Sequence, residues 1–172
     1  MKSLITIALL LSGAAATAQD LDFPTGYRDW IYLTSGMDMS YNPSLFSPGH
    51  HMFDNVFVEP EAYQYFKKNG TWPDKTRLVL EARMAATKGS INKAGMFQSG
   101  EPMAVEVHLK DAALPGGWGF YTYGGETKPA QMVPQDADCY ACHKKDGAVD
   151  TTFVQFYPTL LPIAQAKGTV KN

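Results

Sequence analysis

The segment TRLVLEARM, residues 76–84, decides the class of fold. Apolar residues occupy every second position from 78 to 84, and the charged residues of the segment, at 77, 81 and 83, occupy the alternate positions. This alternation is typical of a β-strand, because successive side chains of a strand point to opposite faces. Residues 103–109 and 117–123 are rich in β-branched and aromatic residues and predict two further strands. The sequence therefore predicts antiparallel strands and excludes a four-helix bundle.

The rest of the chain adds shorter elements. Residues 30–33 and 55–59 predict two short strands. Residues 35–50, with several glycines, prolines and an asparagine, and residues 88–100, which are polar, predict loops. The fold class that we expect is α+β, mainly antiparallel β-sheet with a few helices.

One helix has clear start and stop signals. Glu59-Pro60-Glu61 puts proline and an acid in the first turn, where the fixed proline backbone and the helix dipole favour them. Lysines occupy the last turn, and Asn69-Gly70 ends the helix.

The first 18 residues have the pattern of a secretory signal peptide. Lys2 is the positive head, residues 4–11 are apolar, and Ala16-Thr17-Ala18 is a small-x-small cleavage site. The apolar run is too short to span a bilayer. We therefore expect export to the periplasm, no membrane anchoring, and a single domain over residues 19–172, which is long enough to bury a core.

The charge balance argues against nucleic-acid binding. The net charge is -2 and the sequence pI is about 6.0. The lysine pairs 67–68 and 144–145 are interpreted as solvated surface.

The stretch DCYACHKK, residues 138–145, contains both cysteines of the chain. Cys139 and Cys142 could form a short-loop disulfide beside an unrelated His143. They could instead be a thioredoxin-like redox pair, but no βαβ pattern precedes the motif. The spacing Cys-x-x-Cys-His is also that of c-type haem attachment, in which two thioethers hold the porphyrin and the histidine binds the iron. Residues i and i+3 share a helix face, which suits this third interpretation best. It predicts one covalent haem c with His143 as the iron ligand.

The chain resembles the cytochrome P460 family, which includes the β-sheet cytochromes c′. The residues that carry the resemblance follow the family's order over nearly all of residues 19–172; they are residues 24–30, 55–63, 67–74, 118–121, 139–143 and 150–158. The resemblance implies a homodimer, an antiparallel sheet packed with helices, a covalent haem with His143 as proximal ligand, and an open opposite face of the iron. It names no redox partner.

The resemblance also divides the family by chemistry. Its hydroxylamine-oxidising members carry a lysine, bonded to the porphyrin, on the strand after a Trp-Pro-Asp-like turn. Leu80 stands at that position here, and residues 76–84 contain no lysine. Lys75 would need a displacement of five residues. This departure favours the β-sheet cytochrome c′ type, which implies binding of a small gas, nitric oxide or carbon monoxide.

A bulky apolar cap over the open iron face would favour such gases. Phe53, Phe46 and Leu80 are the candidates for this cap, although each phenylalanine is equally well interpreted as ordinary core. Asp54 lies near a position where oxidising members hold a basic residue. In the pocket it would handle protons, and otherwise it caps a turn.

Other residues are candidates for a sixth iron ligand or a haem contact. His50 and His51 end a loop and are otherwise surface residues, while His108 lies within a predicted strand. Methionine is also an iron ligand in electron carriers; the candidates are Met37, Met39, Met52, Met96 and Met132. Three functions thus remain open: gas binding, oxidation of hydroxylamine or a related nitrogen compound, and electron transfer by a six-coordinate iron.

Overall fold

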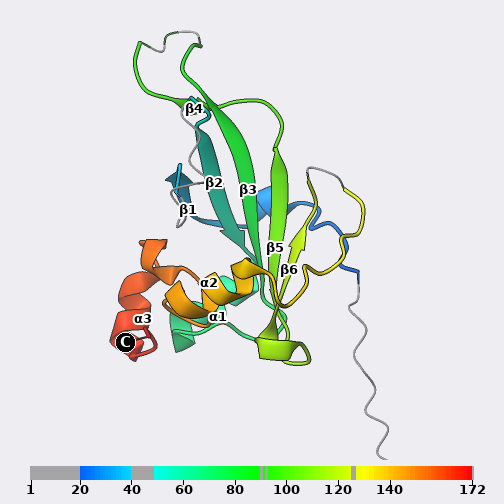
Figure 1. Ribbon diagram of the computed structural model, residues 1–172. Coiled ribbons are helices and arrows are strands. Elements are labelled where there is room, and N and C mark those ends of the chain that lie inside the picture. Colours follow the sequence, from blue (N-terminus) through cyan, green and yellow to red (C-terminus); the bar gives the residue numbers. More distant parts are fainter. Residues whose placement is uncertain (1–19, 40–48, 90, 92, 125–126, 172) are drawn as a thin grey trace, which may run out of the picture.

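A computed structural model describes residues 20–39, 49–89, 91, 93–124 and 127–171, and its centre is a single antiparallel sheet (Figure 1). The strands follow the order β1-β2-β3-β5-β6, and β4 pairs with β3 off this path. Their bounds are β1 Ile31–Met37, β2 Met52–Val58, β3 Arg77–Ala86, β4 Phe97–Gln98, β5 Ala104–Lys110 and β6 Trp118–Thr122. With three α-helices, this confirms the predicted α+β class.

The first hairpin is longer than predicted. Residues 35–37 were predicted as loop and the second strand was predicted to begin at residue 55, but residues 35–37 pair with residues 53–55, with Gly36 opposite Asp54. Asp38, with φ of 55°, accepts a hydrogen bond from the backbone N–H of Met52 at 2.9 Å. β2 also pairs with β3 on its other side, which supports the longer hairpin. Pairing between strands thereby outweighs the low strand propensity of Gly36 in β1.

The helices gather at one end of the sheet (Figure 1). They are α1 Pro60–Asn69, α2 Asp138–Asp146 and α3 Leu161–Lys167. The helix predicted after Glu59 is confirmed as α1, and it ends at Gly70, whose φ of 77° suits glycine and whose N–H bonds the Phe66 carbonyl at 2.7 Å. Its buried Ala62 and Phe66 pack toward the sheet.

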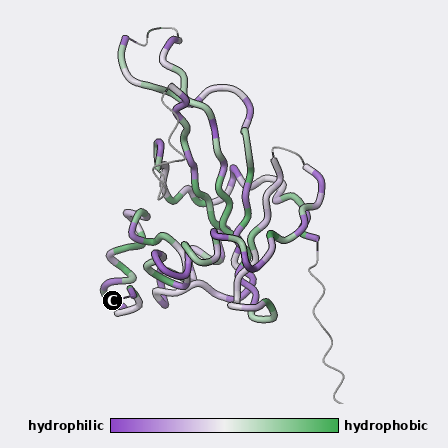
Figure 2. The backbone as a smooth tube through the Cα atoms, in the orientation of Figure 1, coloured by the Kyte–Doolittle hydropathy of each residue, from purple (hydrophilic) through white to green (hydrophobic). Residues whose placement is uncertain are grey.

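Both faces of the sheet are covered. On the face toward the helices, a core of buried residues joins the sheet to α1, α3 and the 3₁₀ turn Val154–Phe156. On the opposite face, Tyr27, Val79, Val107 and Tyr121 belong to a second core. Figure 2 shows hydrophobic residues along the strands, as this two-sided burial requires. Cover on both sides explains why residues 78 and 79, and again 81 and 82, are buried in β3.

Within the described residues, no helix is both long enough and apolar enough to cross a membrane. The predicted signal peptide, residues 1–18, lies outside the described part of the chain.

Candidate functional site

A cavity of about 310 Å³ lies at the sheet face that carries Leu80, with α2 contributing to its lining. Its size is that of a small-molecule site. The strand register explains its wall, because side chains paired across neighbouring strands point to the same face. One row of paired residues crosses the sheet and lines the cavity throughout; it consists of Thr34, Val56, Leu80, Glu106 and Thr122.

A bulge in β1 aligns the edge of this row. The register shifts between Tyr32 and Thr34, which leaves Leu33 in the core and turns Thr34 and Gly36 toward the cavity. A Cβ on Gly36 would lie 2.5 Å from the Met39 sulfur, so only glycine lets Met39 lie this close. Met39 thereby lines the cavity.

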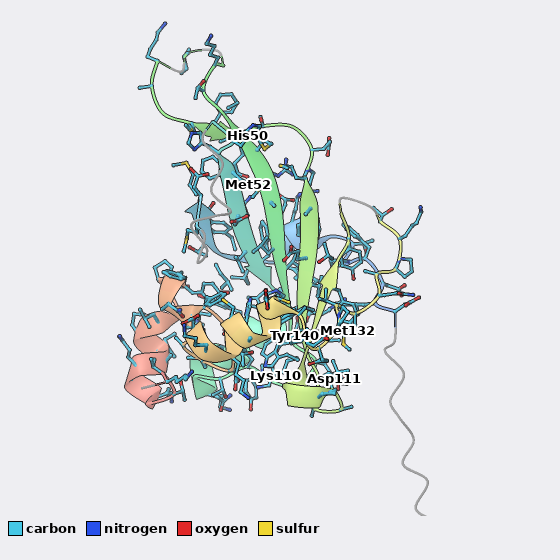
Figure 3. All side chains as sticks on the ribbon, viewed as in Figure 1. His50, Met52, Lys110, Asp111, Met132 and Tyr140 are labelled. Carbon is cyan, nitrogen blue, oxygen red and sulfur yellow. The ribbon has the colours of Figure 1, made fainter. Side chains whose placement is uncertain are left out.

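Helix α2 brings the Cys-x-x-Cys-His motif to the cavity. Cys139 and His143, one helical turn apart, both line it. The two cysteines are free thiols and not a disulfide. Cys142 lies on the same helix, with its sulfur 3.8 Å from an Asp146 carboxylate oxygen. Tyr140 lies on α2 beside the sheet (Figure 3). It fixes the helix to β6, because its ring stacks on Phe120 with 4.3 Å between centroids and its hydroxyl accepts a hydrogen bond from the Phe120 backbone N–H at 3.0 Å. The same hydroxyl donates to the Val133 carbonyl.

One nitrogen of the His143 imidazole is hydrogen-bonded to the backbone. Its Nδ1 lies 2.9 Å from the Thr151 carbonyl oxygen, which can only accept, so Nδ1 carries the proton and Nε2 keeps a lone pair. Burial lowers the pKa of His143, and the Thr151 contact only partly offsets this. The ring packs against Phe153 at 4.4 Å and Phe120 at 4.8 Å. A neutral, oriented imidazole of this kind is the form that binds metal.

The carbonyl that orients His143 belongs to a constrained turn. Asp150 and Thr151 both have positive φ, 49° and 63°. The Asp150 carboxylate accepts hydrogen bonds from the Lys110 ammonium at 2.7 Å and from the Trp72 backbone N–H at 3.2 Å. These contacts to β5 and to the segment before β3 hold an unfavourable backbone in place.

Gly147 allows this turn to lie against the end of α2. A Cβ there would lie 2.5 Å from the Thr151 carbonyl carbon and 2.6 Å from the His143 oxygen. Its φ of -68° and ψ of 129° suit any residue, so only the lack of a side chain explains the glycine.

Two carboxylates, Asp54 and Glu106, line the cavity. Burial raises the pKa of both; the charge of Asp38 adds to the rise for Asp54, and that of Asp54 to the rise for Glu106. The wall therefore combines aliphatic residues, such as Leu80 and Val56, with two carboxyl groups, and Asp54 lies in the pocket rather than capping a turn.

The predicted cap is only partly assembled. Leu80 lines the cavity. Phe53 does not line this cavity: it alternates with Asp54 on β2 and pairs with Met37 and Arg83, on the other face of the sheet. Phe46 lies outside the described residues.

The candidate sixth ligands are mostly remote. His50 and Met52 lie at the end of the sheet away from α2 (Figure 3). His51 Nδ1 is instead 2.6 Å from an Asp38 carboxylate oxygen. His108 lines the cavity, but its ring packs edge to face on His143 at 4.6 Å, beside that imidazole and not across the cavity from it.

Of the candidate methionines, only Met39 is among the described residues that line the cavity. The others do not line it; they are Met37, Met52, Met96 and Met132.

Comparison with known proteins agrees with this architecture. The family model described as Cytochrome P460 matches residues 24–154. The chain belongs to the cytochrome P460 family. No curated protein gave a significant match to the sequence. Cytochrome P460 proteins are haem cytochromes, and the residues present fit a c-type haem: two free thiols and a neutral imidazole with an available Nε2 lie at or beside one cavity.

Sequence reasoning missed two parts of this cytochrome P460 site. Glu106 alternates with Val105 and Val107, so the strand pattern alone predicts that its side chain faces solvent. Only the pairing with Leu80 shows that Glu106 faces the cavity. The role of Thr151 had no sequence signal, because a backbone carbonyl is present at every residue.

Proposed function

We propose that this protein is an exported c-type cytochrome that binds nitric oxide or carbon monoxide at one haem held by Cys139, Cys142 and His143. The haem supplies an iron with an open coordination position for the gas. The closest type within the family is the β-sheet cytochrome c′. The observation that carries the proposal is Leu80 on the cavity wall, at the position where the resemblance places a lysine in the oxidising members.

The cavity lining supports this choice. Within the described residues it includes no lysine, so this wall offers no amine for a bond to a porphyrin. Leu78, Leu80 and Val56 cover the sheet side with aliphatic carbon, which suits a small apolar ligand. The Thr151 carbonyl holds the imidazole of His143 in one orientation.

A second candidate function, oxidation of hydroxylamine or a related nitrogen compound, is favoured by Glu106. Glu106 pairs with Leu80 on the neighbouring strand, and both line the cavity. Burial raises the pKa of Glu106, which makes its carboxylate a better proton acceptor. The third function, electron transfer, has Met39 as its remaining described ligand candidate.

Absorption spectra of the purified reduced protein separate these functions. Gas binding predicts a broad high-spin Soret band that shifts on addition of carbon monoxide or nitric oxide. A red-shifted Soret band of the family's oxidising type would favour the second function, and sharp low-spin bands that do not respond to either gas would refute the proposal. Mass spectrometry tests the covalent haem, because thioether attachment adds one haem mass to the chain.

Location and assembly complete the proposal. Cell fractionation should recover the protein, without residues 1–18, from the periplasm. Light scattering should give the mass of a homodimer, as the family resemblance implies.

A further inference from the structure

Two carboxyl groups line the cavity without a basic partner among the residues that the structure describes. Asp54 and Glu106 line it from β2 and β5, and Leu80 and Ala82 of β3 lie between them in the register. In the described part of the chain neither carboxylate has a hydrogen-bond or ion-pair partner, and no lysine or arginine lines the cavity.

The basic residues of the wall do not pair with the two carboxylates. The rings of His108 and His143 pack on each other at 4.6 Å between centroids, and His143 Nδ1 lies 2.9 Å from the Thr151 carbonyl oxygen. Among the described residues, neither imidazole forms an ion pair with Asp54 or Glu106. The Asp38 carboxylate, which already contacts His51, adds negative charge next to Asp54.

Charge in such a site acts strongly on a bound ion. Charges that share a cavity of low polarisability are screened less than charges at the surface. An anion that enters meets repulsion from both carboxylates, whereas a neutral ligand of the same size does not.

We propose that Asp54 and Glu106 determine ligand charge in this cavity: together they exclude anions and admit neutral or cationic ligands. This inference rests on the proposed haem site, and it identifies the chemical class of ligand that the site accepts.

The test compares an anion with a neutral ligand in the holoprotein. Azide is titrated into the ferric protein and carbon monoxide into the ferrous protein, both at pH 7 and constant ionic strength. The variants are Asp54→Asn and Glu106→Gln, which remove charge with little change in shape. Glu61→Gln, on the exposed first turn of α1, removes the same charge far from the cavity wall and serves as control.

Each cavity variant should bind azide about tenfold more tightly than the unaltered protein, because removing one unit charge lowers the repulsion that an entering anion meets. A tenfold change corresponds to about 1.4 kcal/mol. Carbon monoxide affinity should change less than about twofold, and Glu61→Gln should alter neither ligand. If one variant does not fold, the other decides the question.

Azide affinity that is unchanged in the folded cavity variants overturns the inference, and so does the absence of azide binding in every protein tested. If the unaltered protein fails to bind carbon monoxide, that result refutes the proposed gas-binding function instead. The two failures are therefore distinguishable.

Discussion

Replacing Gly147 by alanine tests how the His143 imidazole is held. The added Cβ would lie 2.5 Å from the Thr151 carbonyl carbon, 2.8 Å from its Cα and 2.6 Å from the His143 oxygen. All three are backbone atoms, so no flexible side chain can move aside. An ordinary contact needs about 3.4 Å or more, and the turn must therefore shift by roughly 1 Å, at a cost of about 1 to 3 kcal/mol for overpacking.

The shift acts directly on the His143 contact. Moving Thr151 away from α2 lengthens the 2.9 Å distance between its carbonyl oxygen and His143 Nδ1. We expect Gly147→Ala to lose about 2 kcal/mol of unfolding free energy in urea and to broaden the Soret band of the holoprotein. Ala141→Ser, which adds one atom to the exposed side of α2, is the control. Equal stability of Gly147→Ala and the unaltered protein, within about 0.5 kcal/mol, would refute this account of the turn.

Three further predictions concern the same residues and the cavity. Thr151→Gly should stabilise the protein by about 1 kcal/mol in urea unfolding. The substitution removes a β-branched residue at φ of 63° and an unpaired buried hydroxyl, and these gains outweigh the entropy cost of glycine. A loss of stability contradicts this. Asp150→Asn should cost about 0.5 kcal/mol at low salt and less at high salt, since its ion pair with Lys110 is partly exposed; the check is urea unfolding at both salt concentrations. Glu106→Gln should be more stable than the unaltered protein at pH 7, because a pKa raised by folding means that the ionised carboxylate opposes folding. This gain in stability should vanish as the pH falls below 4.5, the ordinary pKa of a glutamate side chain. A gain that grows on acidification contradicts this.

Local sequence patterns were sufficient where one segment carries the whole signal. The alternation in residues 76–84 gave β3, and the proline, lysine and glycine signals around α1 gave that helix within its observed bounds. The Cys-x-x-Cys-His spacing placed two thiols and an imidazole on one short helix for the same reason, because a helical turn relates residues three and four apart whatever surrounds it.

Long-range pairing decided the rest of the site. Phe53 and Asp54 are neighbours in the sequence, and only the register of β2 with β1 and β3 shows which of them faces the cavity. No sequence pattern predicts the bulge at Leu33, yet this bulge orients Thr34 and Gly36.

The sequence by itself determined that this chain forms an antiparallel sheet and carries a haem-attachment motif, because backbone geometry within a few residues fixes both. Only the tertiary structure decided the character of the cavity. Glu106 lies opposite Leu80, and Asp54 lies opposite Ala82, two residues further along β3, because strands distant in the sequence pair in one register. Charge in a shared cavity depends on distances through space, and no spacing along the chain encodes them.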